Sequence, residues 1–377
     1  MIESWLTEPL PPEVKAALAR LTSREDIRHV AVMPDVHLSR HFCIGTVVGS
    51  SSRLYPQAVG GDIGCGMMAI AFDVTAGDLF SDGRAESRAE LLLQALGKLI
   101  PKHRHGSRTL PEKLPDELDP QDLSDPRLAK GIVRDARVQL GTLGRGNHFV
   151  ELQRDEDDRL WLMLHSGSRA VGQRLSDFHQ ERCRTGPHGL LWLDAAGADG
   201  AAYLNDVQWA RTYAHLNRSR MLESVTLILE ELFRVPSDPS SLISCDHNHV
   251  QRETHFEESL WVHRKGALRA DAGEKGVIPG SMGTTSFHVT GRGCARALRS
   301  SSHGAGRQMS RSEARRAVGT KQLEAQMGDV FFDQRLAGRL RDEAPASYKD
   351  ITRVMRAQRE LTRIDRRLQP VLSYKGS

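Results

Sequence analysis

The stretch GGDIGCGMMAIAFDV, residues 60–74, decides the fold, because a glycine-rich turn leads directly into an unbroken apolar run. The run MMAIAFDV (67–74) has the composition of a buried strand. Asp62 and Cys65 lie three residues apart in the turn, among four glycines that allow a tight turn and the close approach of a metal ion. Taken alone, a glycine-rich turn with a buried cysteine is the simpler interpretation of this motif.

Three further apolar runs predict buried strands, each ending in a polar segment with glycine or histidine: HVAVMP (29–34), LWLMLHS (160–166) and LISCDHN (242–248). Helices are predicted over Glu86 to Ile100, Asp125 to Leu140, about Ala201 to Phe233 and about Lys349 to Leu368. The mixed order of these elements favours an α+β fold over a regular βαβ series. We expect central β-sheets flanked by helices, with the functional site at the strand ends.

The composition is that of a folded globular protein, with 39% hydrophobic and 27% charged residues among 377. The proline- and charge-rich segment 101–126 is interpreted as a surface insertion rather than a domain boundary, so we expect one domain over residues 1–377. The N-terminus has no basic stretch followed by an apolar run. A cytoplasmic protein without a membrane partner is therefore expected.

The cysteines and the charge exclude some classes of protein. Five cysteines without a C-x-x-C pair fit neither a disulfide framework nor a zinc ribbon, so a functional cysteine is expected to act as a lone thiolate. The net charge of +4 is too small to identify a partner. Arginines nevertheless crowd one C-terminal segment: Arg353, Arg356, Arg359, Arg363, Arg366 and Arg367. A solvated helix face is the simpler interpretation, and contact with nucleic-acid phosphates is the alternative.

Histidines at predicted strand ends point to a metal site. Loops at strand ends can bring ligands together from distant sequence positions. The candidate motifs are GTLGRGNHFVE (141–151) with Asn147, His148 and Glu151, HSGSR (165–169) with His165, and SCDHNHV (244–250) with His247 and Asn248. One such histidine is more often a satisfied core residue, but three of them beside Asp-x-x-Cys favour one or two divalent metals. Thiolate and imidazole by themselves would favour zinc or iron.

The segment SSSHGAGR (300–307) offers a different chemistry. Gly304, Ala305 and Gly306 would let a phosphate approach the backbone, and Arg307 could hold it with two hydrogen bonds. His303 could then act as a nucleophile that forms a phosphoramidate. A structural turn is the simpler interpretation of this segment alone.

Seven motifs in order resemble the RtcB family of RNA-splicing ligases: MPDVH (33–37), DIGCG (62–66), GRGNHFVE (144–151), HSGSR, SCDHN (244–248), PGSMGTTSF (279–287) and SSHGAGR (301–307). The resemblance runs from about residue 28 to the C-terminal Lys-Gly and so covers nearly the whole chain. It implies a single RtcB-like catalytic domain. It also implies a GTP- and manganese-dependent RNA ligase that joins RNA 3′-phosphate, or 2′,3′-cyclic phosphate, to 5′-hydroxyl ends.

The resemblance implies roles for individual residues. Cys65 would bridge two Mn²⁺ ions, one completed by Asp62 and His148 and the other by His165 and His247. His303 would take GMP from GTP, and Arg307 would contact an RNA phosphate. The residues implied to hold the nucleotide are Asn147, Glu151, Asn248, Ser281, Ser286, Gly304, Ala305, Gly306, Tyr348 and Lys375. Among these, Tyr348 would pack on the guanine and Lys375 would read its edge.

Two positions depart from the family pattern. Asp246 precedes His247 where many relatives carry a second histidine, and the loop after MPDVHL reads SRHFCIG (39–45) instead of a glycine-rich form. Asp246 would add negative charge beside the metals and could retune metal affinity or end recognition. The chain is also short for the family, and in this it resembles a branch thought to repair cleaved RNAs with a release-factor-like partner. RNA repair is therefore expected as well as tRNA splicing, with an archease-like activator as a further expected partner.

Two other functions fit the same residues. A binuclear metallophosphoesterase acting on RNA ends would use the same metal ligands but would not need a nucleotide-accepting histidine. A non-catalytic RNA-binding subunit could keep the scaffold, although a binding role would not require all six of the proposed catalytic and metal-binding side chains.

Overall fold

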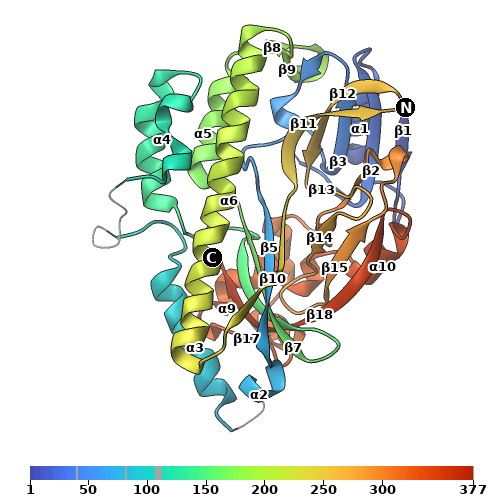
Figure 1. The fold of residues 1–377 in the computed structure, drawn as a ribbon. Coiled ribbons are helices and arrows are strands. Elements are labelled where there is room, and N and C mark those ends of the chain that lie inside the picture. Colours follow the sequence, from blue (N-terminus) through green and yellow to red (C-terminus); the bar gives the residue numbers. More distant parts are fainter. Residues whose placement is uncertain (40, 81–82, 107–112, 377) are drawn as a thin grey trace.

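The structure is a computed structural model that describes residues 1–39, 41–80, 83–106 and 113–376. Two main β-sheets form its centre, and helices pack against them (Figure 1). The prediction of an α+β fold is confirmed.

The larger sheet has eight strands in the order β10-β5-β7-β6-β18-β15-β14, with β17 paired to β18. The bounds are β5 Gly66–Thr75, β6 Phe149–Arg154, β7 Arg159–Ser166, β10 Ser237–Asp246, β14 Lys275–Ile278, β15 Ser286–Gly291, β17 Phe331–Phe332 and β18 Thr362–Lys375. The strands at the two ends of this order, β10 and β14, also contact each other. The sheet therefore nearly closes on itself and encloses an interior.

The smaller sheet has the order β1-β2-β3-β12-β11, and three short pairings lie outside the two main sheets. The bounds are β1 Ile2–Ser4, β2 Ile27–His37, β3 Ile44–Ser50, β11 Asn248–His255, β12 Glu258–Lys265, β4 Arg53–Leu54, β8 Arg184–Thr185, β9 Leu191–Asp194, β13 Ala267–Arg269 and β16 Ser300–Ser302. The pair β13–β16 matters for function, because β16 ends directly before His303.

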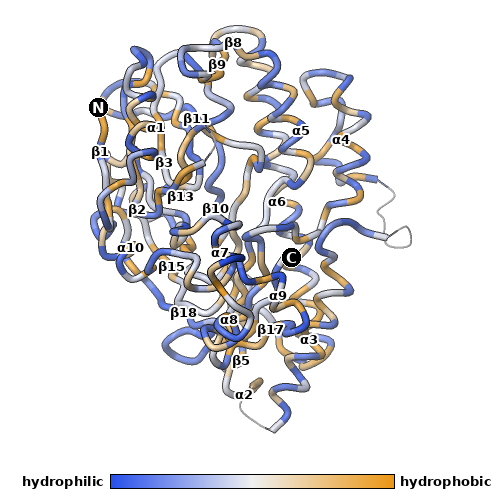
Figure 2. Tube along the Cα trace, turned by 180° about the vertical axis from the view of Figure 1, so that it is seen from behind, coloured by the Kyte–Doolittle hydropathy of each residue, from blue (hydrophilic) through white to orange (hydrophobic). Residues whose placement is uncertain are grey.

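Ten α-helices are found in the described residues: α1 Pro12–Thr22, α2 Ala76–Phe80, α3 Ala85–Leu99, α4 Pro126–Gln139, α5 Arg169–Gln180, α6 Ala198–Phe233, α7 Arg311–Ala317, α8 Thr320–Met327, α9 Ala337–Leu340 and α10 Ile351–Ala357. The long helix α6 runs along the larger sheet (Figure 1). Seen from behind, α7 and α9 lie near the C-terminus (Figure 2). In the described part of the chain, no helix has both the length and the apolar character needed to cross a membrane.

Both faces of the central strands are buried, which explains the unbroken apolar runs in the sequence. Along β5, Met68, Ile70 and Phe72 join a core that α3 and α6 also line. The alternate residues Met67 and Ala69 join another core, enclosed by the nearly closed sheet. Because side chains alternate along a strand, polar residues in register with this second set point into the enclosed interior.

Most of the predicted elements are confirmed. The four predicted strands lie in β2, β5, β7 and β10, and the first three predicted helices agree with α3, α4 and α6. The last predicted helix, from about Lys349 to Leu368, is confirmed only in its first part by α10 and is wrong beyond Ala357, where the chain continues as β18. Strand β18 is placed by its pairing with β6 and β15, and a local helical spacing of charges does not reveal such long-range partners.

The predicted insertion at 101–126 lies partly outside the described residues, which omit 107–112. In its described part, Leu114, Leu118 and Leu123 are buried in a core with α4 and α6, so this part of the segment is anchored to the body of the protein. The single catalytic domain over residues 1–377 stays a prediction.

Candidate metal centre and adjoining cavity

The register of the larger sheet collects the predicted metal ligands at one end. Gly66, which follows Cys65, pairs with Ser166 on β7 and with Asp246 on β10. His165 pairs with Phe149, which follows His148. Strand pairing therefore brings together four segments that are distant in sequence.

Two groups of potential ligands share Cys65. One group is Cys65, His165 and His247, the other is Asp62, Cys65 and His148, and the donor atoms of each lie within 4.8 Å of one another. The Cys65 Sγ is 3.2 Å from His165 Nε2 and 3.5 Å from His148 Nε2. Asp62 Oδ2 is 3.1 Å from His148 Nε2, and His247 Nε2 is 3.3 Å from His165 Nε2. The structure thus brings all five predicted ligands together.

The hydrogen bonds of the histidines fit a metal site. His148 Nδ1 lies 3.0 Å from the Leu143 carbonyl oxygen, and His165 Nδ1 lies 3.2 Å from that of Asn147. A carbonyl oxygen can only accept, so each Nδ1 carries a proton, and each Nε2 is the ring atom that can bind a metal ion. Both Nε2 atoms face the Cys65 sulfur, so the three donor atoms converge on one point.

Burial keeps these groups in forms that a metal ion can use. Burial, followed by charges on neighbouring histidines, lowers the pKa of His165 and His247 well below the usual value, so both are neutral. Burial and then the Asp62 carboxylate raise the pKa of the Cys65 thiol well above its usual value. Burial acts to raise the pKa of Asp62, but the interaction with His148 holds it below its usual range. A cation would therefore displace a proton from Cys65 on binding.

Helix α6 holds the loops that carry these ligands. The buried Arg218 Nη1 donates to the carbonyl oxygens of Gly64 at 2.7 Å and Ser166 at 3.0 Å. The buried Asn217 accepts from the Gly141 amide at 2.7 Å and donates to the Gly167 carbonyl at 3.2 Å. Two adjacent residues of α6 thus hold three segments in place: the loop with Cys65, the loop with His148 and the end of β7 with His165.

His303 lies next to this centre and is held by Asp35. The His303 and His247 ring centroids are 4.7 Å apart. Asp35 Oδ2 is 2.6 Å from His303 Nδ1 and accepts a further hydrogen bond from the His303 amide at 3.2 Å. Asp35 is fully buried in β2. A carboxylate acceptor fixes the proton on Nδ1, which leaves Nε2 of His303 free to act as a nucleophile.

A cavity of about 220 Å³ adjoins His303 and His165. Of the predicted nucleotide and phosphate residues, it is lined by Asn147, Glu151, Ser281, Gly304, Ala305, Gly306, Arg307, Tyr348 and Lys375. Strand alternation explains part of this set, because Glu151 pairs with Ser373 and Phe149 pairs with Lys375. Glu151 and Lys375 consequently both point into the enclosed interior.

A buried carboxylate, Glu343, organises the far end of the cavity. Tyr348 Oη donates to Glu343 Oε2 at 2.7 Å, Lys375 Nζ lies 2.9 Å from the same oxygen, and Arg311 donates to Oε1. Burial acts to raise the pKa of Glu343, but the Lys375 and Arg311 charges lower it. Lys375 is only 6% exposed, so it is not the ordinary solvated lysine that a C-terminal position would predict.

Some predicted residues have structural partners instead of cavity positions. Asn248 donates to the Asp62 carbonyl at 3.1 Å and accepts from the Gly266 amide at 2.8 Å. Ser286 is buried, and its hydroxyl accepts from the Gly280 amide at 3.2 Å. Gly306 lines the cavity and also has a structural role, because its φ is +74° and a Cβ there would lie 2.3 Å from the Asp35 carbonyl oxygen.

The departures from the family pattern lie close to the centre. Asp246 Oδ2 accepts from Arg211 Nε at 2.7 Å, and Asp246 Oδ1 is 2.9 Å from His249 Nδ1. Its carboxylate therefore belongs to neither ligand group, and its effect on metal affinity stays a prediction. In the SRHFCIG loop, residue 40 lies outside the described residues, and Phe42 and Cys43 are buried in the core beneath the smaller sheet.

Sequence reasoning assigned no role to Asp35, His37, Arg311 or Glu343, all of which lie at the site. The MPDVH motif contains the first two, and its polar residues inside an apolar strand were the available signal. Arg311 and Glu343 lie in ordinary helical and loop sequence, so no local pattern distinguishes them.

Burial of Glu151 gives a testable dependence of stability on pH. Burial raises the pKa of Glu151 to about 7, above the usual 4.5, while Gln153 and Lys375 oppose this shift. The folded state therefore binds this proton more tightly, and stability falls as the pH rises from about 4.5 to 7. Glu151→Gln should remove this loss, so its stability relative to wild type should rise by about 2 kcal/mol between pH 5 and pH 8.

Urea unfolding of the metal- and nucleotide-free proteins at both pH values measures this difference. The exposed Glu156→Gln is the matched control. An equal difference between Glu151→Gln and wild type at pH 5 and pH 8 would contradict the prediction.

Comparison with known proteins identifies the family. The family model described as tRNA-splicing ligase RtcB matches residues 17–125 and 121–376. RNA-splicing ligase RtcB1 and RNA-splicing ligase RtcB, each from a strain of Escherichia coli, are 38% identical over 413 aligned residues, which cover 100% of this chain and 97% of each relative. RNA-splicing ligase RtcB of Mycobacterium tuberculosis is 27% identical, with 93% of this chain and 97% of the relative covered. The chain therefore belongs to the RtcB family.

Proposed function

We propose that this protein is a GTP- and manganese-dependent RNA ligase that joins an RNA 3′-phosphate, or a 2′,3′-cyclic phosphate after ring opening, to a 5′-hydroxyl end through guanylylated His303. Membership of the RtcB family supports the enzyme class, an RNA ligase. The observation that carries the mechanism is the buried Asp35–His303 pair beside two ligand groups that share Cys65. RNA repair and tRNA splicing are both uses of this chemistry.

The first step is a transfer to the protein. Nε2 of His303 forms a bond to the α-phosphorus of GTP, and pyrophosphate leaves. Asp35 supports this step because it holds the Nδ1 proton at 2.6 Å and stabilises the positive charge that develops on the ring. Gly304 and Ala305 line the cavity directly after His303, where backbone amides can approach a phosphate.

Two further transfers complete the reaction. An oxygen of the RNA 3′-phosphate bonds to the phosphorus of GMP while the bond to His303 breaks, which gives an RNA–GMP anhydride. The 5′-hydroxyl oxygen of the second RNA end then bonds to the RNA 3′-phosphorus, loses its proton, and GMP leaves. Arg307 lines the cavity near His303, where its guanidinium donates to the Met309 carbonyl at 3.0 Å and the Asp342 carbonyl at 2.7 Å. We propose that an N–H group left over from these bonds contacts an RNA phosphate.

We propose that Asp62, Cys65 and His148 hold one manganese ion and that Cys65, His165 and His247 hold the other. A bound divalent cation supplies positive charge that offsets the charge of phosphate oxygens. The convergence of the two Nε2 atoms on the Cys65 sulfur, at 3.5 Å and 3.2 Å, supports a metal site of this kind. The choice of manganese rests on the family resemblance, since this donor set also suits softer ions.

The side chains of the cavity favour the binding of guanine over that of adenine. Glu151 offers an acceptor on the same inner face where Lys375 offers a donor. Guanine presents donors at N1 and N2 and an acceptor at O6, whereas adenine presents a donor at N6. Glu343 holds Lys375 in place at 2.9 Å, and Tyr348 offers a ring for the base to pack on.

Loss of the shared thiolate should weaken both metal sites. In Cys65→Ser a hydroxyl that stays protonated replaces the sulfur, so we expect manganese affinity to fall at least ~10-fold at both sites. Isothermal titration with Mn²⁺ measures this, with Cys183→Ser as a matched control, because the Cys183 Sγ donates to the His179 carbonyl and Cys183 belongs to neither ligand group. Unchanged metal content and activity in Cys65→Ser would show that Cys65 is structural.

Guanylylation should depend on His303 and on the tautomer that Asp35 fixes. With α-labelled GTP and Mn²⁺, His303→Ala should give no covalent label, and wild type should give a label that acid removes and mild alkali does not. Asp35→Asn should slow labelling by ~100-fold or more, because an amide no longer holds the Nδ1 proton as a carboxylate does. The exposed Asp73→Asn is the control. Label that persists in His303→Ala would exclude this nucleophile.

The polarity of the ends follows from the direction of GMP transfer. The acceptor of GMP must be a terminal phosphate, so the enzyme should seal 3′-phosphate to 5′-hydroxyl RNA and fail with 3′-hydroxyl and 5′-phosphate ends. Ligation of two RNA pairs with identical sequences, in GTP and Mn²⁺, measures this. Efficient sealing of the second pair would overturn the mechanism. Removal of the terminal phosphate without sealing would favour the metallophosphoesterase, and RNA binding with neither reaction would favour the non-catalytic subunit.

A further inference from the structure

A basic groove of about 690 Å³ lies beside the cavity that adjoins His303, which we call the nucleotide cavity. Its charged lining comes from three separate segments and includes Arg145, Arg311, Arg315, Arg339, Asp342 and Glu343. Arg145 lies in the loop before His148, Arg311 and Arg315 lie on α7, and Arg339 lies on α9. Arg311 also lines the nucleotide cavity, so the two spaces adjoin.

The charges of the groove are unbalanced. Asp342 is 2.8 Å from Arg311 and 3.2 Å from Arg315, and Glu343 is held by Arg311 and Lys375. Both carboxylates are therefore neutralised by partners within the protein. Arg145 and Arg339 are exposed, and in the described part of the chain neither forms an ion pair with a carboxylate. The Arg145 Nε instead lies 3.4 Å from His103 Nδ1.

Further cationic side chains lie between the groove and the loop that carries His148. Arg169 Nη2 donates to the Lys102 carbonyl oxygen at 3.3 Å, next to His103, whose Nδ1 lies 3.4 Å from Arg145 Nε. Burial lowers the pKa of His103, and the charges of Arg145, Arg169 and Lys102 lower it further. Arg169 and Arg145 therefore add positive charge beside the groove.

We infer that this groove holds the phosphodiester backbone of the RNA strand whose end reaches the metal centre. The geometry favours contact with phosphates over contact with bases, because no Phe, Tyr or Trp lines the groove among the described residues and its unpaired groups are guanidinium ions. Binding is then independent of sequence and sensitive to salt. This inference rests on the proposed function, and it identifies the surface that binds the RNA strand beyond its reacting end.

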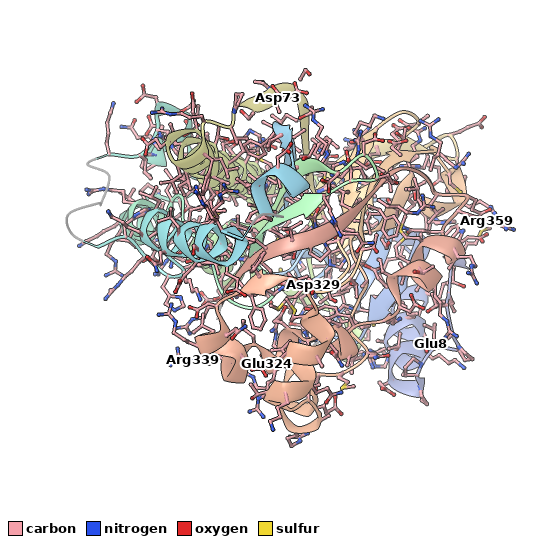
Figure 3. All side chains as sticks on the ribbon, turned by 90° about the horizontal axis from the view of Figure 1, so that it is seen from below. Glu8, Asp73, Glu324, Asp329, Arg339 and Arg359 are labelled. Atoms are coloured by element: carbon pink, nitrogen blue, oxygen red, sulfur yellow. The ribbon has the colours of Figure 1, made fainter. Side chains whose placement is uncertain are left out.

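The test uses Arg145→Glu, Arg339→Glu and the double variant, with Arg359→Glu as the matched control. Arg339 and Arg359 are both exposed, and they lie on opposite sides of the view in Figure 3. Arg359 is a suitable control because it lines neither the groove nor the cavity beside His303. The probe is a fluorescein-labelled single-stranded RNA of 12 nucleotides with a 3′-phosphate, and fluorescence anisotropy at 0.1 M and 0.3 M salt gives Kd without any need for ligation.

We expect Kd at 0.1 M salt to rise at least ~10-fold in the double variant and to stay within about twofold of wild type in the control. The slope of log K against log salt should become shallower by about 1.4, at ~0.7 for each phosphate of a single strand that the protein no longer neutralises. If the double variant unfolds, as judged by circular dichroism, Arg339→Ala alone should still raise Kd by ~3-fold. A Kd and a salt slope equal to those of Arg359→Glu would overturn the inference.

Labelling of His303 with GTP, measured on the same wild-type preparation, separates the two proposals. Normal labelling with unchanged RNA affinity in the groove variants would reject the groove and leave the ligase proposal standing. Absence of labelling in wild type, with RNA affinity still reduced in the groove variants, would reject the nucleotide chemistry and keep the groove as an RNA-binding surface.

Discussion

The burial of the Cys65 sulfur between two imidazole nitrogens is the contact on which the rest of the site depends. At 3.2 Å from His165 and 3.5 Å from His148, the sulfur lies where both ligand groups meet. These three side chains come from segments that are distant in sequence. The register of strands β5, β6, β7 and β10 brings them together at one end of the larger sheet.

Polar groups outside the ligand set keep the centre in shape. Asn217 and Arg218 on α6 bond to the loops before β5 and β6, which carry Cys65 and His148, and to the end of β7, which carries His165. Asp35 does the same for His303 from the smaller sheet. A buried charged or amide side chain is costly unless its bonds are made, so these residues fix one arrangement of the loops. Polar side chains from helix α6 and from the smaller sheet therefore hold the site in one arrangement.

The space around His303 divides into two parts with different chemistry. The nucleotide cavity lies inside the nearly closed sheet, and Glu343 gathers Tyr348, Lys375 and Arg311 at its far end. The basic groove begins on the other side of Arg311 and contains Arg145 and Arg339, which have no carboxylate partner in the described part of the chain. Under the proposed function, the first space holds the nucleotide and the second the RNA strand, and the two meet at Arg311.

The sequence by itself determined the elements whose pattern is local, together with the residue types of the site. The apolar runs predicted β2, β5, β7 and β10, the helical spacing predicted α3, α4 and α6, and the ordered motifs predicted the family and the residues that now lie together around Cys65. Only the tertiary structure decided that residues 362–375 form a strand, that Asn248 and Ser286 bond to backbone groups, and that Asp35 and Glu343 hold His303 and Lys375. The physical reason is that hydrophobic periodicity acts over a few neighbouring residues. By contrast, the pairing of β18 with β6, and of Asp35 with a histidine 268 residues away, arises only when distant segments pack together.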